Sequence, residues 1–430
     1  MSFLLLRKEI KSLVEHVNTT VKVMGFVKRI RKVGNKLMFI VLSDYSGSIQ
    51  LVISSNLPSQ LTHESSIEAV GKVVESKHGI EIQVEQLKIL ALASNELPFE
   101  VSSEEINANL STILDYRAFS LRNEKIAAIF KVQSTITTGF SEFLLGKGFT
   151  SFKSPKLVAG ATETGASVFS MNYFGQTACL AQSPQFYKQM MVGSGLERVF
   201  EIGPVFRAES HNTSRHINEY TSLDLEMGFI TNINELIKLE QELLNYIVNK
   251  LNIERQAELK SLNVYPLELG EIPVMTLAKA KQILKNEYKH EVLATDIDPK
   301  GEKLISQYVK QHFKSDAVFL TEYPKEARPF YTMPHQENKE LTQSFDLIYK
   351  GVEITTGGLR IHNHEQLLKS ANEAGLNAEE TKHYLAMFKL GMPPHGGFAI
   401  GLERLTARLL GIDNVKESTL FPRDQHRLVP

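Results

Sequence analysis

Apolar and polar residues alternate along the first part of the chain, between residues 20 and 91. The alternation falls into five short runs separated by turn residues, as in Ile80-Glu-Ile-Gln-Val-Glu85. Successive side chains of a strand point to opposite faces, so this pattern predicts five strands, each with one solvent-exposed face. Five short strands within about 70 residues favour a small closed Greek-key barrel.

A barrel of this size is typical of the OB-fold, which binds single-stranded nucleic acid or oligosaccharide across one face. A purely structural barrel is the alternative. We assign residues 1–92 to this domain. Its first residues, Met1 to His16, begin with a short apolar run but have no long apolar stretch and no small-residue cleavage site. We therefore expect a helix there and not a signal peptide.

The pattern changes after this domain. Residues 93–120 are rich in Ser, Asn and Glu and lack sustained periodicity, which predicts a linker or hinge. From residue 121 onward, helical and strand-like patterns follow one another. Apolar stripes predict helices over 124–145, 232–251 and 401–411, and strand-like runs lie near 197–208, 219–230, 341–361 and 396–400. Strands paired through turns favour an antiparallel sheet flanked by helices, so we expect an α+β domain over residues 121–430.

Composition adds constraints on the class of protein. Hydrophobic residues make up 42% and charged residues 23% of the chain, which is ordinary for a soluble protein. No apolar run is long enough to cross a bilayer, so we expect no membrane association. The single cysteine, Cys179, excludes an intramolecular disulfide framework and a Cys-rich zinc site. These features fit a cytoplasmic protein.

The net charge of −1 hides a basic N-terminal segment. Residues 1–36 carry nine Lys or Arg side chains against only Glu9 and Glu15. A solvated strand edge would explain such a cluster. On its own the cluster favours that ordinary reading, and a surface for nucleic-acid phosphates is the more specific alternative.

The segment from Phe206 to Glu226 is the first with evident chemistry. Two strand-like runs flank a polar loop that contains Arg207, Glu209 and Arg215. Arginines at the base and tip of such a hairpin could grip a polyphosphate through bidentate, charge-assisted bonds, and Tyr220 could stack on a base. An exposed hairpin with ordinary salt bridges is the alternative.

Two further segments carry a related signal. Gly396 to Arg404 is a glycine-rich strand that runs into a helix with Arg404 in its first turn, and it lacks the pattern of a Walker loop. Phe345 to His362 predicts a hairpin that brings Asp346 and Glu353 together on adjacent strands. Two such carboxylates with phosphate oxygens would suit Mg²⁺. Arg360 could take a substrate carboxylate. His362 and His364 could in principle bind zinc, but no third ligand is in register.

Together these segments resemble motifs 2 and 3 of class II aminoacyl-tRNA synthetases and the strand before motif 3. Helix 124–145 with the following Gly148 to Pro155 resembles motif 1, which forms the dimer in that family. The predicted barrel in front of this domain is the arrangement of the aspartate, asparagine and lysine subgroup. Within it, the chain is most similar to the compact archaeal-type aspartyl-tRNA synthetases, and the similarity includes the stretches Gln182 to Gln189 and Gly391 to Gly397.

The resemblance implies a homodimer that activates L-aspartate with ATP and Mg²⁺ and transfers it to the 3′ end of tRNA(Asp), leaving open whether tRNA(Asn) is charged too. It implies that Arg207 contacts the α-phosphate and the reacting carboxyl group, and that Arg404 contacts the γ-phosphate. The residues it implies for ATP are Arg207, Glu209, Arg215, His216, Tyr220, Glu353, Gly401 and Arg404. Those for aspartate are Glu163, Gln185, Lys188, Arg207, Asp224, Thr356 and Arg360. Magnesium is implied at Asp346, Glu353 and Thr356, and the anticodon at Arg31, Phe39 and Gln50.

The chain also departs from the family pattern. Thr164 stands where the mobile loop usually has Gly, Phe26 replaces the usual Trp of the first barrel strand, and Ser102 to Leu114 match poorly. Three alternatives stay open. An asparaginyl-tRNA synthetase is disfavoured by Lys188, because a neutral amide gives that cation no matching partner. A paralogue that acts on a free small molecule would typically lose the barrel. A regulatory nucleic-acid-binding protein would have no use for the arginines and carboxylates.

Overall fold

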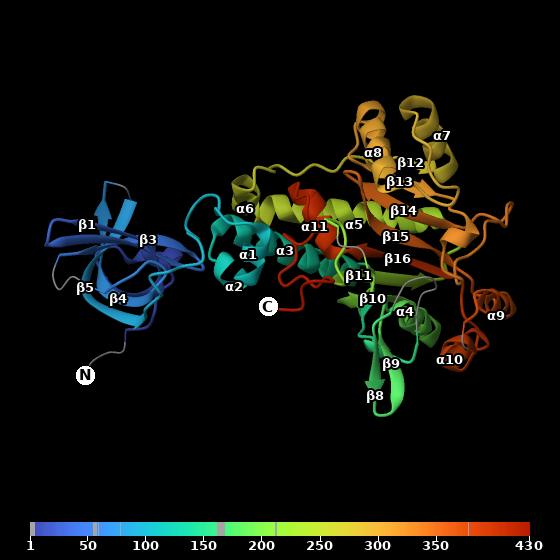
Figure 1. Ribbon diagram of the computed structural model, residues 1–430, viewed down its shortest axis with the longest axis horizontal. Coiled ribbons are helices and arrows are strands. Elements are labelled where there is room, and N and C mark those ends of the chain that lie inside the picture. The colour runs from blue at the N-terminus through green and yellow to red at the C-terminus, as the bar shows by residue number, and fades with distance from the viewer. Residues whose placement is uncertain are drawn as a thin grey trace. The chain divides into compact units, whose positions relative to one another are not determined.

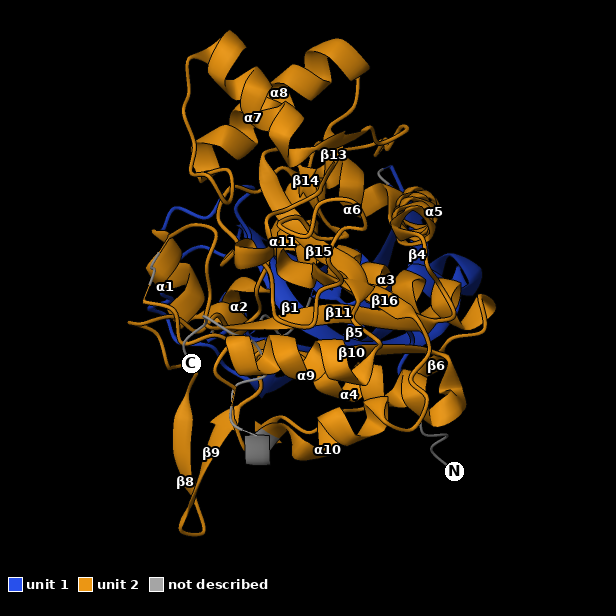
Figure 2. Ribbon diagram, turned by 90° about the vertical axis from the view of Figure 1, so that its right-hand side faces the viewer, with its two compact units in different colours: residues 1–108 blue, residues 109–430 orange. Residues whose placement is uncertain are grey.

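The computed structural model describes residues 5–430 except 55–57, 59, 78, 161–167, 211–212 and 377. The chain forms two compact units, Met1–Ala108 and Asn109–Pro430, which are coloured separately in Figure 2. The division falls inside the segment 93–120 that the sequence suggests as a linker. Each unit has its own hydrophobic core.

Unit 1 is a closed barrel with the strand order β1-β2-β3-β5-β4, which confirms the predicted five-stranded barrel. A short 3₁₀ helix, η1 (Ile10–His16), precedes it. Alternation decides which side chains fill the barrel. In β2, for example, Met38, Ile40 and Leu42 are fully buried, whereas Phe39 lies on the outer face. The strands are β1 (Thr20–Val33), β2 (Leu37–Asp44), β3 (Gly47–Ile53), β4 (Ser66–Ser76) and β5 (Gly79–Ala91).

Unit 2 begins with three helices, α1 (Leu110–Asp115), α2 (Arg117–Ser120) and α3 (Glu124–Gly146). The Asn109 side chain accepts a hydrogen bond from the backbone N–H of Thr112 and so caps α1. Asn123 caps α3 in the same way. Two asparagines, one inside and one just after the segment 93–120, therefore cap the starts of helices. The long helix predicted over 124–145 is confirmed.

A large sheet forms the centre of unit 2 (Figure 1). Its neighbouring strands are antiparallel, except that β12 pairs with β13 and β6 with β10 in parallel. This confirms the predicted α+β class. In spatial order the described strands are β12 (Val274–Thr276), β13 (Ala317–Thr321), β14 (Ser344–Tyr349), β15 (Val352–Arg360), β16 (His395–Gly401), β11 (Glu219–Gly228), β10 (Arg198–Phe206) and β6 (Thr150–Ser151).

The two faces of this sheet differ in polarity. One face packs on α3, α5 (Ile233–Glu254) and α11 (Leu402–Leu410) to form the main core. In β11, Leu223 and Leu225 point into that core, so the alternate residues Asp224 and Glu226 point to the opposite face. That opposite face carries the polar residues that the sequence singles out.

Helices cover both ends of the polar face (Figure 1). An apolar cluster joins α7 (Leu277–Tyr288) and α8 (Pro299–Phe313) to Val318 and Ile348 of the sheet. A second cluster joins α4 (Gln185–Met191), α9 (His364–Glu373) and α10 (Ala378–Phe388). The stretch between these clusters stays open.

Shorter elements complete unit 2. A small separate sheet is formed by β7 (Leu157–Val158), β8 (Ser170–Tyr173) and β9 (Gln176–Leu180). Three short helical segments are α6 (Gln256–Ser261), η2 (Val192–Leu196) and η3 (Lys325–Ala327). Among the described residues, the helices are too short or too polar to span a membrane.

Candidate active site

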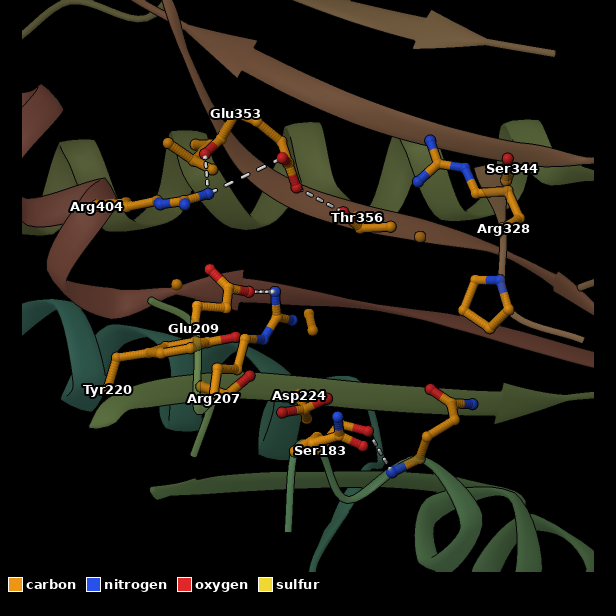
Figure 3. Close-up of a pocket in the computed structure, with 18 of the residues that line it drawn as sticks. Ser183, Arg207, Glu209, Tyr220, Asp224, Arg328, Ser344, Glu353, Thr356 and Arg404 are labelled. Atoms are coloured by element: carbon orange, nitrogen blue, oxygen red, sulfur yellow. Dashed lines mark hydrogen bonds and ion pairs between the residues drawn. The ribbon is translucent and has the colours of Figure 1, made fainter. Parts of the chain in front are cut away.

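A pocket of about 600 Å³ opens on the polar face of the large sheet (Figure 3). Its walls come from β11, β15, β16, α4, the start of α11 and the loop 326–332. The structure brings thirteen of the residues expected from the sequence to these walls. They are Gln185, Lys188, Arg207, Glu209, Arg215, His216, Tyr220, Asp224, Glu353, Thr356, Arg360, Gly401 and Arg404.

One end of the pocket is formed by the hairpin of β10 and β11. Asn218 closes this hairpin, because its backbone C=O accepts from the Arg207 N–H at 2.8 Å and its side chain donates to the Arg207 C=O at 2.7 Å. Arg207 follows β10 directly, and its guanidinium lies 5.5 Å from the ring centre of Tyr220. Glu209 stands 4.0 Å from Arg207 in a weak ion pair. A flat ring beside a cation and a carboxylate suits a purine nucleotide.

Arg404 and Glu353 face this hairpin from the neighbouring strands. The Arg404 guanidinium donates to the backbone C=O of Glu353 at 3.1 Å and lies 3.9 Å from its carboxylate. The Thr356 hydroxyl donates to the same carboxylate at 2.7 Å. Burial acts to raise the pKa of Glu353, but Arg404 and the Thr356 hydroxyl outweigh it and hold the pKa below its usual value. Glu353 is therefore an anion at neutral pH.

The glycines of β16 allow this close packing of strands. A Cβ on Gly397 would lie 2.1 Å from the backbone oxygen of Leu225 and 2.3 Å from the carboxylate of Glu226. Only glycine fits there. Gly401 ends the strand and provides the start of α11, which places Arg404 in the first turn of the helix.

Arg215 is held by a residue that the sequence did not indicate. Its guanidinium pairs with Glu302 of α8, and Glu302 also accepts from the backbone N–H of Glu353 at 3.3 Å. Two further nitrogens of Arg215, Nε and Nη1, are buried and have no hydrogen-bond partner in the described part of the chain. These donors lie at the pocket wall. Burial raises the pKa of Glu302 to about 7, with Arg215 opposing.

The other end of the pocket holds a buried set of two cations and two carboxylates. The Lys188 ammonium lies 3.1 Å from Asp224 and 3.3 Å from Glu226. Arg360 donates through Nε to Glu226 at 2.9 Å. Burial acts to raise both carboxyl pKa values. The pKa of Asp224 is raised, whereas Arg360 and Lys188 hold that of Glu226 below its usual value.

A neutral hydrogen-bonded chain braces α4 behind this set. Tyr384 donates to the Gln189 amide oxygen at 3.0 Å, and the Gln189 amide nitrogen lies 2.8 Å from Nε2 of His395. Nδ1 of His395 lies 2.8 Å from the Pro393 C=O and donates to it. Burial lowers the pKa of His395 to about 4, so the ring is neutral and Nε2 accepts. Gln189 adjoins Lys188, so this series of hydrogen bonds fixes the helix that carries the lysine.

Asp346 occupies a less open position than the sequence suggests. A β-bulge between Leu347 and Ile348 shifts the hairpin, so Asp346 pairs with Thr356 and Ile348 pairs with Glu353. The bulge leaves the two acidic side chains on one face of the sheet. Glu353 lines the pocket, but Asp346 is buried behind it and pairs with Arg328 at 2.7 Å.

These residues fit a magnesium ion. Oδ1 of Asp346 is buried and accepts no hydrogen bond within the described residues. An unsatisfied carboxylate oxygen close to a second carboxylate and a hydroxyl is a donor set that Mg²⁺ accepts, since this ion keeps waters and phosphate oxygens as its other ligands. Zinc at His362 and His364 finds no support, because no group of three His, Cys, Asp or Glu suited to a metal occurs in the described ranges.

The remaining expected residues lie elsewhere. Glu163 falls in 161–167, outside the described residues. Arg31, Phe39 and Gln50 come together on the outer face of the barrel in unit 1. Arg31 lies across from Phe39 on the paired strands, with its guanidinium 4.6 Å from the ring centre. Gln50 donates to Glu81 at 3.0 Å.

The sequence reasoning missed Arg328, which lines the pocket, and two carboxylates, Glu226 and Glu302, which pair with lining residues. Glu226 was within reach, because Leu-Asp-Leu-Glu alternates and places Glu226 on the face of Asp224. Glu302 and Arg328 gave no local signal. Each comes from a segment far from the motifs in sequence and joins the pocket only through tertiary packing.

Family models match both units. Residues 109–425 match the model for tRNA synthetases class II (D, K and N), and residues 21–90 match the model for the OB-fold nucleic acid binding domain. The first match covers well over half of the chain.

Similar proteins span the whole chain. An aspartate–tRNA(Asp/Asn) ligase of Deinococcus radiodurans is 46% identical over 98% of both chains. An aspartate–tRNA(Asp) ligase of Pyrococcus horikoshii is 42% identical over 95% of this chain and 96% of its own. Among solved structures, the aspartyl-tRNA synthetase of Entamoeba histolytica superposes with a TM-score of 0.87 at 30% identity, covering 99% and 93% of the two chains. The asparaginyl-tRNA synthetase of P. horikoshii with bound asparaginyl-adenylate gives 0.90 at 28%, covering 99% and 100%.

Proposed function

The chain belongs to the class II tRNA synthetases of the aspartate, lysine and asparagine group, and on this basis we propose that it is an aspartate–tRNA ligase. It activates L-aspartate with ATP and transfers the aspartyl group to tRNA. Relatives named for tRNA(Asp) alone and for both tRNA(Asp) and tRNA(Asn) match at similar identity. Charging of tRNA(Asp) is therefore the common activity.

The pair of buried cations at one end of the pocket carries the choice of amino acid. Lys188 and Arg360 are 1% and 6% exposed, and both line the pocket. A substrate carboxylate at that point gains two charge-assisted contacts in a site shielded from water. The neutral amide of asparagine would offer these two cations no substrate anion, which disfavours the asparaginyl reading. Asp224, on the same wall, suits the α-ammonium group.

The remaining pocket residues suit the activation step. The α-carboxylate of aspartate attacks the α-phosphorus of ATP, a P–O bond forms, and the bond to pyrophosphate breaks. This step needs positioning and neutralisation of phosphate charge more than a general base. We assign Arg207 to the α-phosphate and the reacting carboxylate, and Arg404 to the γ-phosphate. Glu209 and Tyr220 take the adenine, Arg215 and His216 the outer phosphates, and Gly401 leaves space beside the nucleotide.

Asp346, Glu353 and Thr356 would hold magnesium, which supplies further neutralisation of the phosphate charge when it is bound. We assign Gln185 and Glu163 to the binding of aspartate as well. In the second half-reaction a hydroxyl of the terminal tRNA nucleotide attacks the aspartyl carbonyl and releases AMP.

The barrel residues Arg31, Phe39 and Gln50 contact the anticodon. We place the enzyme in the cytoplasm, where its tRNA substrates are used.

Pyrophosphate exchange tests the amino-acid assignment. ATP–pyrophosphate exchange should depend on aspartate and respond barely to asparagine, and charging of purified tRNA(Asp) and tRNA(Asn) should show which tRNAs are accepted. Equal exchange with both amino acids would contradict the aspartate assignment.

Lys188→Ala sharpens this test. The variant should lose roughly 2–5 kcal/mol in kcat/KM for aspartate, because a buried charge-assisted contact is removed. The KM for ATP should change little, since Lys188 lies at the opposite end of the pocket. Lys369→Ala is a matched control, because Lys369 is exposed on α9 and outside the pocket. An equal loss for both substrates would mean that Lys188 only supports the fold.

We also propose a homodimer formed through α3, on the motif 1 resemblance of this helix. A symmetric dimer uses the same patch of both copies. Light scattering at micromolar concentration should report about twice the chain mass of 48.4 kDa. A fully active monomer would contradict the proposal.

A further inference from the structure

Arg328 is a buried cation in the pocket that lies outside the motif segments identified in the sequence. It follows η3 and precedes Pro329, and a residue before proline favours the extended backbone seen here, with φ −125° and ψ 152°. Its guanidinium lies 3.7 Å from the ring centre of Tyr323 and 2.7 Å from Asp346. Its side chain is 9% exposed. Stacking and pairing together fix the charge at this point.

The position of Arg328 relative to the carboxylates is the decisive observation. Arg328, Glu353 and Thr356 line the pocket, but Asp346 does not. In Figure 3, Arg328 projects from the pocket wall beside Ser344 and Thr356, the cross-strand partner of Asp346. A cation that enters through the pocket therefore meets the guanidinium before it meets Asp346.

Electrostatics explains why a guanidinium is placed here. Asp346 is buried, Glu353 lies on the neighbouring strand with its side chain partly exposed, and the charge of Glu353 makes ionisation of Asp346 more costly. Arg328 offsets that repulsion in the protein without ligand, because it lowers the energy of both anions. The pairing of Arg328 with Asp346 leaves some of their polar atoms unsatisfied, however. Nε of Arg328 and Oδ1 of Asp346 have no hydrogen-bond partner among the residues that the structure describes.

We propose that Arg328 is a built-in counter-ion of Asp346 that competes with the divalent cation, so that the pocket binds the metal together with the nucleotide and poorly alone. The inference rests on the proposed magnesium site. Without nucleotide, a metal ion must displace the guanidinium from Asp346 and lose bound water. In exchange it gains only the few ligands that the protein offers. With nucleotide present, phosphate oxygens give the metal further ligands and give the displaced guanidinium, which already lines the pocket, a new anionic partner.

The first experiment measures metal binding without nucleotide. Mn²⁺ is titrated at pH 8, followed by electron paramagnetic resonance, into wild type, Arg328→Gln, Arg328→Lys and the double variant Arg328→Gln/Asp346→Asn. Arg328→Gln should bind Mn²⁺ roughly tenfold more tightly than wild type, within the usual range of coupling between two sites. Arg328→Lys keeps the charge and should resemble wild type. The double variant should lose the gain.

Binding by Arg328→Gln that is no tighter than wild type overturns the proposal, and so does a gain that survives Asp346→Asn. Should Arg328→Gln fail to fold in circular dichroism melts, wild type and Asp346→Asn decide. The proposal expects equally weak Mn²⁺ binding by both without nucleotide. A tight wild-type site that Asp346→Asn abolishes overturns it.

The second experiment separates this inference from the proposed function. Titration calorimetry measures binding of a non-hydrolysable ATP analogue with and without Mn²⁺. Wild type should bind the analogue more tightly with the metal, and Arg328→Gln should show a smaller dependence, because its metal site fills without nucleotide. No effect of Mn²⁺ in any protein would overturn the magnesium part of the proposed function and this inference with it. An equal effect in both proteins would overturn this inference alone.

Discussion

Glu240 shows how a single buried acid can set the pH response of the fold. It lies on the face of α5 that packs under the large sheet and is fully buried. No hydrogen bond of normal geometry reaches its carboxyl oxygens within the described residues. Burial raises its pKa to about 8, with the Thr355 hydroxyl opposing and the Asp346 charge adding to the rise. The side chain is therefore protonated at neutral pH in the folded protein.

This pKa predicts a loss of stability as pH rises. In the unfolded chain the carboxyl ionises near 4.5, and in the folded chain near 8. Between these values the unfolded state releases a proton that the folded state retains, so unfolding becomes easier by up to several kcal/mol. Glu240→Gln should remove this part of the pH dependence and be more stable than wild type at pH 8.

Urea unfolding of both proteins at pH 5.5 and 8 checks this expectation. The difference between wild type and variant isolates Glu240 from Glu302 and Glu403, whose pKa values burial also raises to about 7. Glu242→Gln is the control, since Glu242 sits on the same helix with its side chain 39% exposed. An unchanged pH slope in Glu240→Gln would contradict the prediction.

Residue-level prediction from the sequence worked where a motif fixes the position. Arg207, Lys188 and Arg404 reach one pocket because each sits at a defined place on a helix, or directly after a strand, that the pattern already indicates. It did not work for Arg328 and Glu302. Their contacts depend on how the loop 326–332 and α8 pack against the sheet, and no local pattern encodes that packing.

At the scale of elements, long periodic segments were predicted well and short ones were not. Helix α3 and helix α5 follow their apolar stripes to within a few residues. Helices α1 and α2 are only six and four residues long, too short for a periodic stripe to appear. The segment that contains them therefore looked like a linker, although it carries an important contact.

That contact is Arg117 of α2, which ties this segment to the C-terminal part of the chain. The side chain is 2% exposed, and it donates to the backbone C=O groups of Lys416, Glu417, Thr419 and Leu420. The same C-terminal stretch is bonded to the motif 2 loop, because the Asn218 N–H donates to the Arg423 C=O at 2.7 Å. Arg117 therefore stabilises the C-terminal stretch that supports the β10–β11 hairpin at one end of the pocket.

Arg117→Lys should weaken this support. Lysine cannot reach four carbonyls in the planar arrangement of a guanidinium, so buried acceptors lose their donors at about 1–3 kcal/mol each. The melting temperature should fall, and amide hydrogen exchange over residues 415–424 should rise more than elsewhere. Arg198→Lys on β10 is the control, since that arginine is 41% exposed. Unchanged exchange over 415–424 would show that the contact is dispensable.

At the scale of the whole molecule, the change from strand alternation to helical periodicity indicated two domains. The structure divides after Ala108, where unit 1 ends. The sequence could show that the barrel and the α+β domain have separate cores, because each pattern is complete in itself. It could not show the division to the residue, since Ser- and Asn-rich stretches serve both as linkers and as helix caps.

Separate cores predict that tRNA recognition and amino-acid activation can be uncoupled by mutation. Phe39 and Arg31 stack on the outer face of the barrel, and Gln50 lies on the next strand with its amide held by Glu81. Bases of a single strand would stack on Phe39, and the Gln50 amide would read a base edge. Stacking is worth about 1–3 kcal/mol per base, and a good hydrogen-bonded pair is comparable.

Phe39→Ala/Gln50→Ala should therefore lower kcat/KM for tRNA charging by one to several decades, by that estimate. Aspartate-dependent pyrophosphate exchange should hardly change, because the pocket residues all belong to unit 2. Gln86→Ala, at an exposed position of β5, should change neither reaction. Both reactions are measured on the same preparations. If exchange falls together with charging, the barrel acts through stability. If charging is unaffected, the anticodon is not read by these residues, and the outer face of β2 and β3 has no part in recognition.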